Sequence, residues 1–193
     1  MSQLEQHLDH YSAQLEQLKQ QGNLRQFTSN IQHGRTIQIN GQSMLNLSSN
    51  DYLGLASDLH LREQFFDQTP NDLRIMSSSS SRLLTGNFPA YEQLEASLSQ
   101  AFHGRSALLF NSGYHMNIGI LPALSDARTL ILADKLIHAS MIDGIRLSSA
   151  KYVRYRHNDL NHLSQLLQKY HADESFDRII VVTESIFSMD GDE

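Results

Sequence analysis

The chain has 193 residues, of which 40% are hydrophobic, 19% charged and 8% aromatic. This is a globular composition with enough length for one domain or one and a half. No apolar run approaches the roughly 20 residues of a transmembrane helix, which excludes a membrane-spanning protein and leaves the cytoplasm as the expected location. The net charge of −6 disfavours nucleic-acid binding, and the absence of cysteine excludes disulfides, thiolate zinc sites and cysteine nucleophiles.

The N-terminal part predicts a helix followed by a β-hairpin. Apolar residues recur at spacings of three and four over residues 1–22, which is typical of an amphipathic helix. Residues 35–39 and 43–47 are joined by Asn40-Gly41, a pair that favours a type I′ turn. We therefore expect residues 1–50 to form a separate N-terminal segment.

Two further helices are predicted before the pattern changes. A short polar helix is expected around 58–68, and a second over 89–102 begins with Pro89, whose fixed φ suits a first helical turn. Between them lies the serine run Ser77–Ser81, which we interpret as a flexible loop.

From residue 106 on, short apolar runs rich in β-branched residues alternate with helical stretches. The expected strands are 106–111, 129–134, 151–155 and 178–184, and the expected helices are 114–125, 138–149 and 159–171. Such alternation indicates βαβ units and a parallel-rich sheet with helices on both faces, which is an α/β fold. Ligands bind at the carboxyl ends of strands in folds of this class.

A first candidate site follows the first expected strand, in Asn111-Ser112-Gly113-Tyr114. Glycine permits close approach of the backbone, and free N–H groups at a helix N-terminus attract a phosphate or another anion. Taken alone, the motif is more often an ordinary strand-to-helix turn.

A second candidate is His138, which follows the second strand and precedes an apolar helix. An imidazole there can stack on a flat ligand or transfer a proton. It can equally cap the helix, and both interpretations remain open.

Polar residues also cluster at the end of the last expected strand and just after it: Glu184, Ser188, Asp190 and Asp192. They can orient a cofactor, bind a metal or cap a helix. We reject a calcium site because the other oxygen ligands at EF-hand spacing are missing.

His157 and His162 are five residues apart and do not share a helix face. With Asn158-Asp159 between them, they predict a turn and a helix N-cap, with surface or capping roles for the histidines. No metal site is expected here or elsewhere.

Six motifs in order resemble the α-oxoamine synthases, a family of pyridoxal-phosphate (PLP) enzymes with the aspartate-aminotransferase fold, PLP-dependent transferase fold type I. The motifs are NLSSNDYLGLA (46–56), SRLLTGN (81–87), ALLFNSGYHMN (107–117), ADKLIHASMIDGIRLS (133–148), RHND (156–159) and VVTESIFSMDGD (181–192). The resemblance runs from Leu18 to Glu193 and implies that residues 51–193 are the N-terminal part of a large PLP-binding domain.

The resemblance implies roles for individual residues. The residues that it places at the cofactor are Gly113, Tyr114, His138, Glu184 and Ser188, with His138 also catalytic. Gly113 and Tyr114 would donate N–H groups to the PLP phosphate, His138 would stack on the pyridine ring, and Ser188 would lie near its phenolic oxygen. Arg25 and Asn50 would bind the substrate carboxylate or an acyl thioester.

Within the family, SSNDYLGLA and the N-terminal helix are most like the members that condense L-alanine with a pimeloyl thioester, releasing CO2 and the free thiol. Members that use glycine or serine with other acyl thioesters remain an alternative. Family enzymes are homodimers, so a homodimer is expected for the full-length protein.

Two departures from the family pattern affect these expectations. A glycine-rich segment of the family is replaced by Ser77–Ser81, which would strain or reshape that loop if positive φ angles are needed. The chain also ends at Glu193, before the aspartate, histidine and Schiff-base lysine of the family. We therefore expect these 193 residues alone to be inactive, as part of a longer polypeptide or as a non-catalytic truncated homologue.

Overall fold

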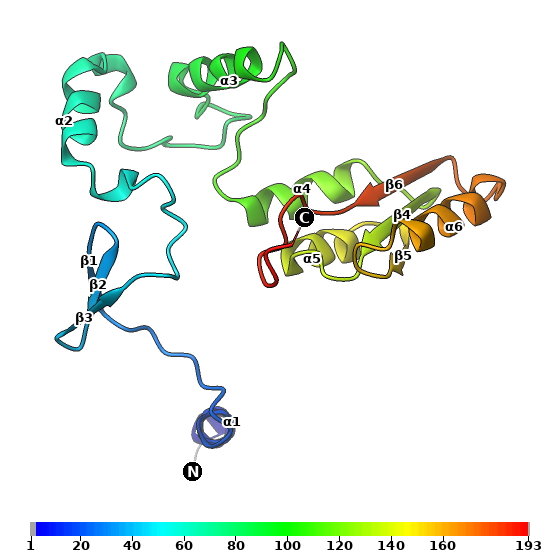
Figure 1. The fold of residues 1–193 in the computed structure, drawn as a ribbon, viewed down its shortest axis with the longest axis horizontal. Coiled ribbons are helices and arrows are strands. Elements are labelled where there is room, and N and C mark those ends of the chain that lie inside the picture. Colours follow the sequence, from blue (N-terminus) through cyan, green and yellow to red (C-terminus); the bar gives the residue numbers. More distant parts are fainter. Residues whose placement is uncertain (1–2, 193) are drawn as a thin grey trace. The chain divides into compact units, whose positions relative to one another are not determined.

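The computed structural model describes residues 3–192, with side chains described from Leu8 on. The chain forms two compact units, one within its first 78 residues and one from Ser79 on (Figure 1). The expected division between residues 1–50 and 51–193 remains a prediction about the domains of the protein.

The first unit combines helices with a small antiparallel sheet. Its elements are α1 (Gln3–Gln20), β1 (Asn30–His33), β2 (Thr36–Ile39), β3 (Gln42–Leu45), α2 (Leu59–Gln68) and two 3-10 turns at Leu55–Ser57 and Asn71–Leu73. The expected hairpin is confirmed, because β2 pairs with β3 and both Asn40 and Gly41 have positive φ, at 50° and 78°. The sequence reasoning missed β1, which pairs with the other edge of β2.

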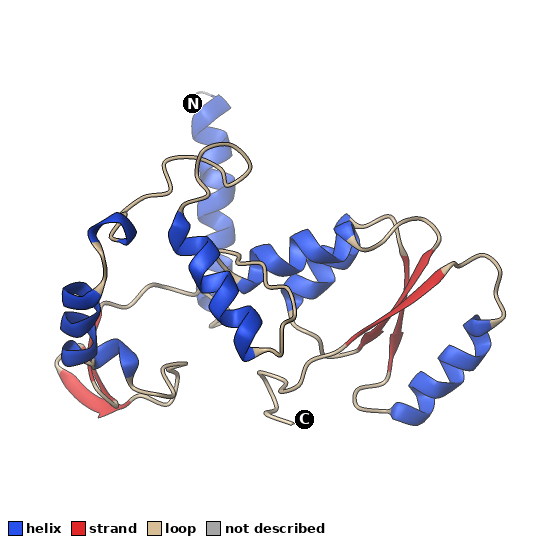
Figure 2. Ribbon diagram, turned by 90° about the horizontal axis from the view of Figure 1, so that it is seen from above, coloured by secondary structure: helices blue, strands red, loops and turns tan. Residues whose placement is uncertain are grey.

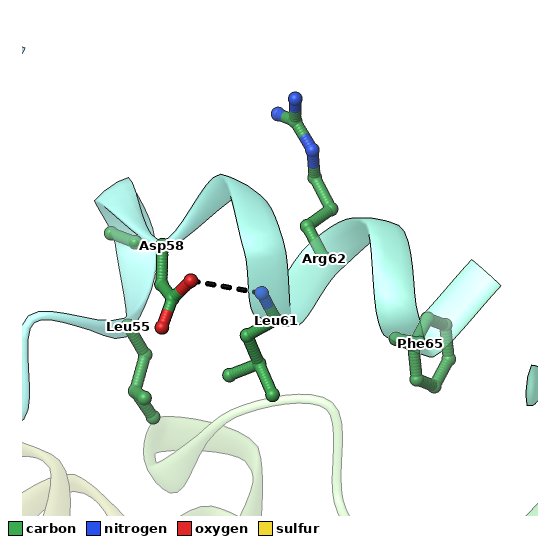
Figure 3. Close-up of a pocket in the computed structure, with 6 residues that line it drawn as sticks. Leu55, Asp58, Leu61, Arg62 and Phe65 are labelled. Carbon is green, nitrogen blue, oxygen red and sulfur yellow. Dashed lines mark hydrogen bonds between the residues drawn. The ribbon is translucent and has the colours of Figure 1, made fainter. Parts of the chain in front are cut away.

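The first unit leaves much of its apolar surface exposed. The large apolar side chains of α1 from Leu8 on are all at least 40% exposed. At the start of α2, Asp58 caps the helix by accepting a hydrogen bond from the Leu61 amide at 2.8 Å. Figure 3 shows this cap beside an open pocket, which is lined mainly by apolar residues such as Leu55 and Phe65.

The second unit carries the parallel sheet. Its elements are α3 (Pro89–Ala101), α4 (Gly113–Ala123), β4 (Thr129–Asp134), α5 (Ala139–Leu147), β5 (Lys151–Tyr155), α6 (Leu160–His171) and β6 (Arg178–Val182). The strand order is β5-β4-β6, with both pairings parallel. The expected strands 129–134 and 151–155 are confirmed, as is the one near 178–184.

The expected strand at 106–111 is wrong, because these residues have no strand pairing in the structure. The Leu109 amide donates instead to the Glu95 carboxylate of α3, at 2.8 Å. Glu95 also accepts two hydrogen bonds from Arg82, at 2.7 and 3.0 Å, and these bonds with the Leu109 amide lower its pKa to about 2. This segment is therefore fastened by a side chain rather than by a neighbouring strand.

Strand β4 lies at the centre of the sheet and is buried throughout, because helices cover both faces. Ile131 and Ala133 pack into a cluster with Leu121 of α4 and Ile145 of α5. Leu130 and Leu132 face the opposite way, toward a cluster that includes apolar residues of α6. Figure 2 shows the strands between α6 and the other helices of this unit. This is the α/β layering that the alternating pattern predicted.

Helices α4 and α5 approach closely at Gly144. A Cβ atom added there would lie 2.3 Å from the Asn117 carbonyl oxygen and 3.1 Å from a methyl carbon of Leu121. The backbone of α4 is fixed by its own hydrogen bonds, so it cannot yield as a flexible side chain would. Glycine is therefore required at this position by the close packing of the two helices.

We expect Gly144→Ala to lower the free energy of unfolding by about 1–3 kcal/mol, because overpacking forces the two helices apart. Gly119→Ala on α4 is the matched control, since its Cβ would lie at an ordinary 3.5 Å from the Phe110 ring. The control should be neutral or stabilising by up to about 1 kcal/mol, as alanine favours a helix. Urea unfolding of both variants measures the difference, and equal stability would contradict the packing argument.

No helix of the part of the chain that the structure describes is long and apolar enough to cross a lipid bilayer.

Candidate functional site

The candidate site lies at the carboxyl edge of the parallel sheet in the second unit. Strands β4, β5 and β6 end there, at Asp134, Tyr155 and Val182. Because α4 leads into the amino end of β4 and α5 follows its carboxyl end, both helices begin at this same edge. Helix α6 also begins at this edge, after β5, so the edge gathers three strand ends and three helix N-termini, as expected for ligand binding in this class of fold.

His138 is the N-cap residue of α5. Its Nδ1 atom accepts a hydrogen bond from the Ser140 amide at 3.2 Å and lies 2.7 Å from the Ser140 hydroxyl. Because Nδ1 serves as the acceptor, we assign the ring proton to Nε2. These hydrogen bonds confirm the capping role. Because the residue is exposed, it also remains accessible to a ligand.

Glu184 joins the loop after β6 to the start of α5. Its Oε1 atom accepts a hydrogen bond from the backbone amide of His138 at 2.5 Å. These two predicted site residues are 46 positions apart in the chain and adjacent in the structure. The carboxylate thereby fixes the backbone that carries the imidazole.

Helix α4 is tied to the same site by two side-chain contacts. Asn117 donates to the Ser140 hydroxyl at 2.8 Å, which continues the chain of hydrogen bonds to His138. The Tyr114 hydroxyl donates to Asp143 of α5 at 3.4 Å. The N-termini of α4 and α5 are thus held in a fixed relation.

The N-terminus of α4 has the form of an anion site. Ser112 caps the helix by accepting from the His115 amide at 3.1 Å. Among the hydrogen bonds of the described residues, the amides of Gly113 and Tyr114 have no acceptor in the protein. Nothing lies within 4 Å of the position that a Cβ would take on Gly113. The residues present therefore fit a phosphate at the helix N-terminus.

Of the polar residues after β6, Ser188 and Asp190 are exposed in the turn at 188–190. Asp192 turns back toward the sheet, where its Oδ2 atom lies 2.7 Å from Nε2 of His157. The cofactor role assigned to Ser188 remains a prediction.

The interpretation of His157 as a surface or capping residue is wrong. Its side chain is 22% exposed and lies between two carboxylates, with Nδ1 2.9 Å from Asp134 and Nε2 2.7 Å from Asp192. The N-cap of α6 is instead Asp159, which accepts from the His162 amide at 2.7 Å, so that part of the prediction is confirmed. The sequence signal for His157 was its position two residues after the end of a strand.

The charges in this group stabilise one another. Hydrogen bonds first to Asp134 and then to Asp192 raise the pKa of the His157 imidazole above its ordinary value. Burial would raise the pKa of Asp134, but the amides of Leu136 and Asn158 together with His157 outweigh it and lower that pKa. Both shifts favour the protonated imidazole beside the ionised Asp134, compared with either group in isolation.

Arg25 and Asn50 belong to the first unit and are both exposed. The Tyr52 amide donates to the Asn50 carbonyl at 3.0 Å, and the Tyr52 hydroxyl donates to the Asn50 side-chain oxygen at 3.4 Å. Their roles in substrate binding remain predictions.

In the serine run, Ser79 has a φ of 58°, the left-handed conformation that favours glycine.

The chain is similar to several curated bacterial proteins. A protein of Pasteurella multocida, provisionally named 8-amino-7-oxononanoate synthase, is 60% identical over 95% of this chain and 47% of its own length. Proteins with the same provisional name from Haemophilus influenzae and Neisseria meningitidis are 56% and 57% identical, over 96% and 94% of this chain and 48% and 47% of their own. The chain thus spans about half the length of these relatives.

Solved structures show the fold. A serine palmitoyltransferase from S. paucimobilis, determined with PLP and myriocin bound, matches with a TM-score of 0.79 at 24% identity, over 100% of this chain and 48% of its own. A serine palmitoyltransferase of Sphingomonas wittichii matches with a TM-score of 0.78 at 27% identity, over 99% of this chain and 47% of its own. The expected α/β architecture of PLP-dependent transferase fold type I is confirmed.

The model of the family of class I and II aminotransferases matches residues 42–193, which include all of the second unit and part of the first. The chain therefore belongs to the aminotransferase class I and II family.

Proposed function

We propose that this chain forms the N-terminal half of an 8-amino-7-oxononanoate synthase. The complete enzyme would condense L-alanine with a pimeloyl thioester and release 8-amino-7-oxononanoate, CO2 and the free thiol in biotin biosynthesis. The observation that carries the proposal is the edge at which the α4 amides, the exposed ring of His138 and Glu184 meet. Relatives at 56–60% identity support the choice of reaction within the family.

The cofactor of this proposal is PLP, which when bound withdraws electrons from the α-carbon of an amino acid and so permits condensation and loss of CO2. Gly113 and Tyr114 would hold its phosphate through their backbone N–H groups. His138 would lie against the ring and keep the reacting carbon in place, with its Nε2 proton available to the substrate. Glu184 would fix the backbone of His138 through the 2.5 Å hydrogen bond.

The remaining predicted residues complete this scheme. Ser188 would donate its hydroxyl to the phenolic oxygen of the cofactor, and Arg25 and Asn50 would bind the carboxylate and the thioester. We further propose that the protein is a cytoplasmic homodimer.

The four lysines of the chain are Lys19, Lys135, Lys151 and Lys169. None stands in the context of the family's Schiff-base lysine, so a segment beyond Glu193 would supply it.

The test is an assay of thiol release by the polypeptide encoded in the complete reading frame, purified with PLP. L-alanine, glycine and serine are each combined with pimeloyl, short-chain and long-chain acyl thioesters. We expect release with L-alanine and the pimeloyl thioester, and none above background from the 193-residue chain alone, because it lacks the lysine.

Other outcomes would identify the alternatives. Preference for glycine would indicate 2-amino-3-ketobutyrate ligase or 5-aminolevulinate synthase, and preference for serine with a long acyl chain would indicate serine palmitoyltransferase. No release with any pair, or a reading frame that stops at Glu193, would favour a non-catalytic homologue.

A further inference from the structure

The three strand ends of the second unit are joined through the side chain of His157. The neighbouring Asn158 supports the same connection, because its amide donates to Asp134 and its side-chain nitrogen donates to Asp192, each at 3.0 Å. Its Nδ1 lies 2.9 Å from Oδ1 of Asp134, the last residue of β4, and its Nε2 lies 2.7 Å from Oδ2 of Asp192. His157 itself lies two residues after the end of β5, and Asp192 belongs to the loop after β6. The imidazole therefore connects segments that are 23 and 35 positions away from it in the chain.

The Asp134 end of this connection is rigid. Its side chain is fully buried and accepts further hydrogen bonds from the amides of Leu136 at 2.8 Å and Asn158 at 3.0 Å. The His157 ring also meets the buried Phe187 ring edge-on, with centroids 4.5 Å apart. The imidazole is thus held by packing as well as by hydrogen bonds.

The Asp192 end closes a loop. The Phe187 amide donates to the Asp192 carbonyl at 2.9 Å, and the Gly191 amide donates back to the Phe187 carbonyl at 2.8 Å. Ser188 lies inside this closed loop, and Glu184 lies just before it. Holding Asp192 therefore holds the segment that carries both residues.

The protonation of His157 matches this geometry. A neutral imidazole has a single N–H and would turn a lone pair toward one of the two carboxylates. The doubly protonated ring donates to both, and donation from a charged group gives the stronger hydrogen bond. The doubly protonated ring is therefore the form that can donate to both aspartates at once.

We propose that His157 is a positioning residue, which clamps the loop at 184–192 to the end of β4 so that Glu184 and Ser188 are held beside His138. It does not touch the reacting atoms. This inference rests on the proposed function, in which those three residues surround PLP.

The test uses the complete polypeptide with His157→Gln, Asp192→Asn and the double variant. His171→Gln, an exposed histidine at the end of α6, is the matched control. Amide hydrogen exchange of Phe187 and Gly191 reports on the loop without cofactor, and titration with PLP followed by visible circular dichroism gives its Kd.

We expect His157→Gln to accelerate exchange at both amides and to raise the Kd of PLP about tenfold or more, since small misplacements in a site are costly. The double variant should be close to His157→Gln, because the carboxamide oxygen of Asp192→Asn can still accept from Asn158, and both changes then act mainly on the contact between His157 and Asp192. The control should match the unsubstituted protein.

Two results would overturn the inference. Unchanged exchange at Phe187 and Gly191 in His157→Gln would show that the loop is not clamped. Faster exchange with an unchanged Kd and unchanged KM for the amino acid would reduce His157 to a structural role. Absence of PLP binding in the unsubstituted protein is a separate result, which would refute the proposed function and with it the role toward the cofactor.

Discussion

His138→Ala is expected to reduce kcat/KM for thiol release by about 10²–10⁴-fold, the range found for a positioned proton-transfer group. The ring is exposed at the carboxyl edge, its Nε2 carries the proton, and the Glu184 carboxylate fixes its backbone at 2.5 Å. The same substitution removes the N-cap of α5 and should cost about 0.5–2 kcal/mol of stability. Steady-state kinetics of the complete polypeptide, with urea unfolding alongside, measure the two losses separately.

His138→Asn separates these losses. Asparagine is among the best N-cap residues, so its side-chain oxygen can accept from the Ser140 amide as Nδ1 of His138 does at 3.2 Å. We expect the asparagine variant to recover the stability but not the activity. If activity returned with the cap, the role of His138 would be to begin the helix rather than to face the cofactor.

The layered fold was predictable because its signals are local. Residues 130–133 of strand β4 are an unbroken apolar run that faces helices on alternate sides, and this pattern is present in the sequence. The segment 106–111 has a similar composition but no partner strand, since the parallel sheet among the described residues contains only β5, β4 and β6. Composition predicts an apolar extended segment, while pairing depends on what lies next to it.

The candidate site was predictable only in part, for a related reason. His138 and Glu184 each follow a strand, and that local signal was sufficient to select them. The environment of His157 depends on two aspartates far along the chain, which the strand order brings together. A histidine beside Asn158-Asp159 looks like a turn residue until the end of β4 is known to lie next to it.

Asp134→Ala is expected to have the largest effect on stability, lowering the free energy of unfolding by about 2–5 kcal/mol. The carboxylate is fully buried and accepts from the amides of Leu136 and Asn158 and from the His157 ring. Alanine would leave these donors without an acceptor and the imidazole with one carboxylate in place of two. Urea unfolding of the complete polypeptide measures the loss.

Asp134→Asn is the matched variant, because it keeps the size of the side chain and one acceptor oxygen. Its NH2 group would face one of the donors, so we expect a stability between those of Asp134→Ala and the unsubstituted protein. Equal stability of all three proteins would show that water satisfies the donors instead.

The pH dependence of these variants follows from the two pKa shifts. Because the pKa of Asp134 is lowered in the folded protein, its contribution is present above the ordinary value of 3.8 and is lost as the pH falls through the lowered one. Because the pKa of His157 is raised, its contribution is complete below the ordinary value of 6.5 and is lost as the pH rises through the raised one. The stability difference between Asp134→Ala and the unsubstituted protein should therefore be greatest between these two ordinary values and decrease on both sides. A difference that keeps increasing with alkaline pH would contradict a charged imidazole at the centre of the connection.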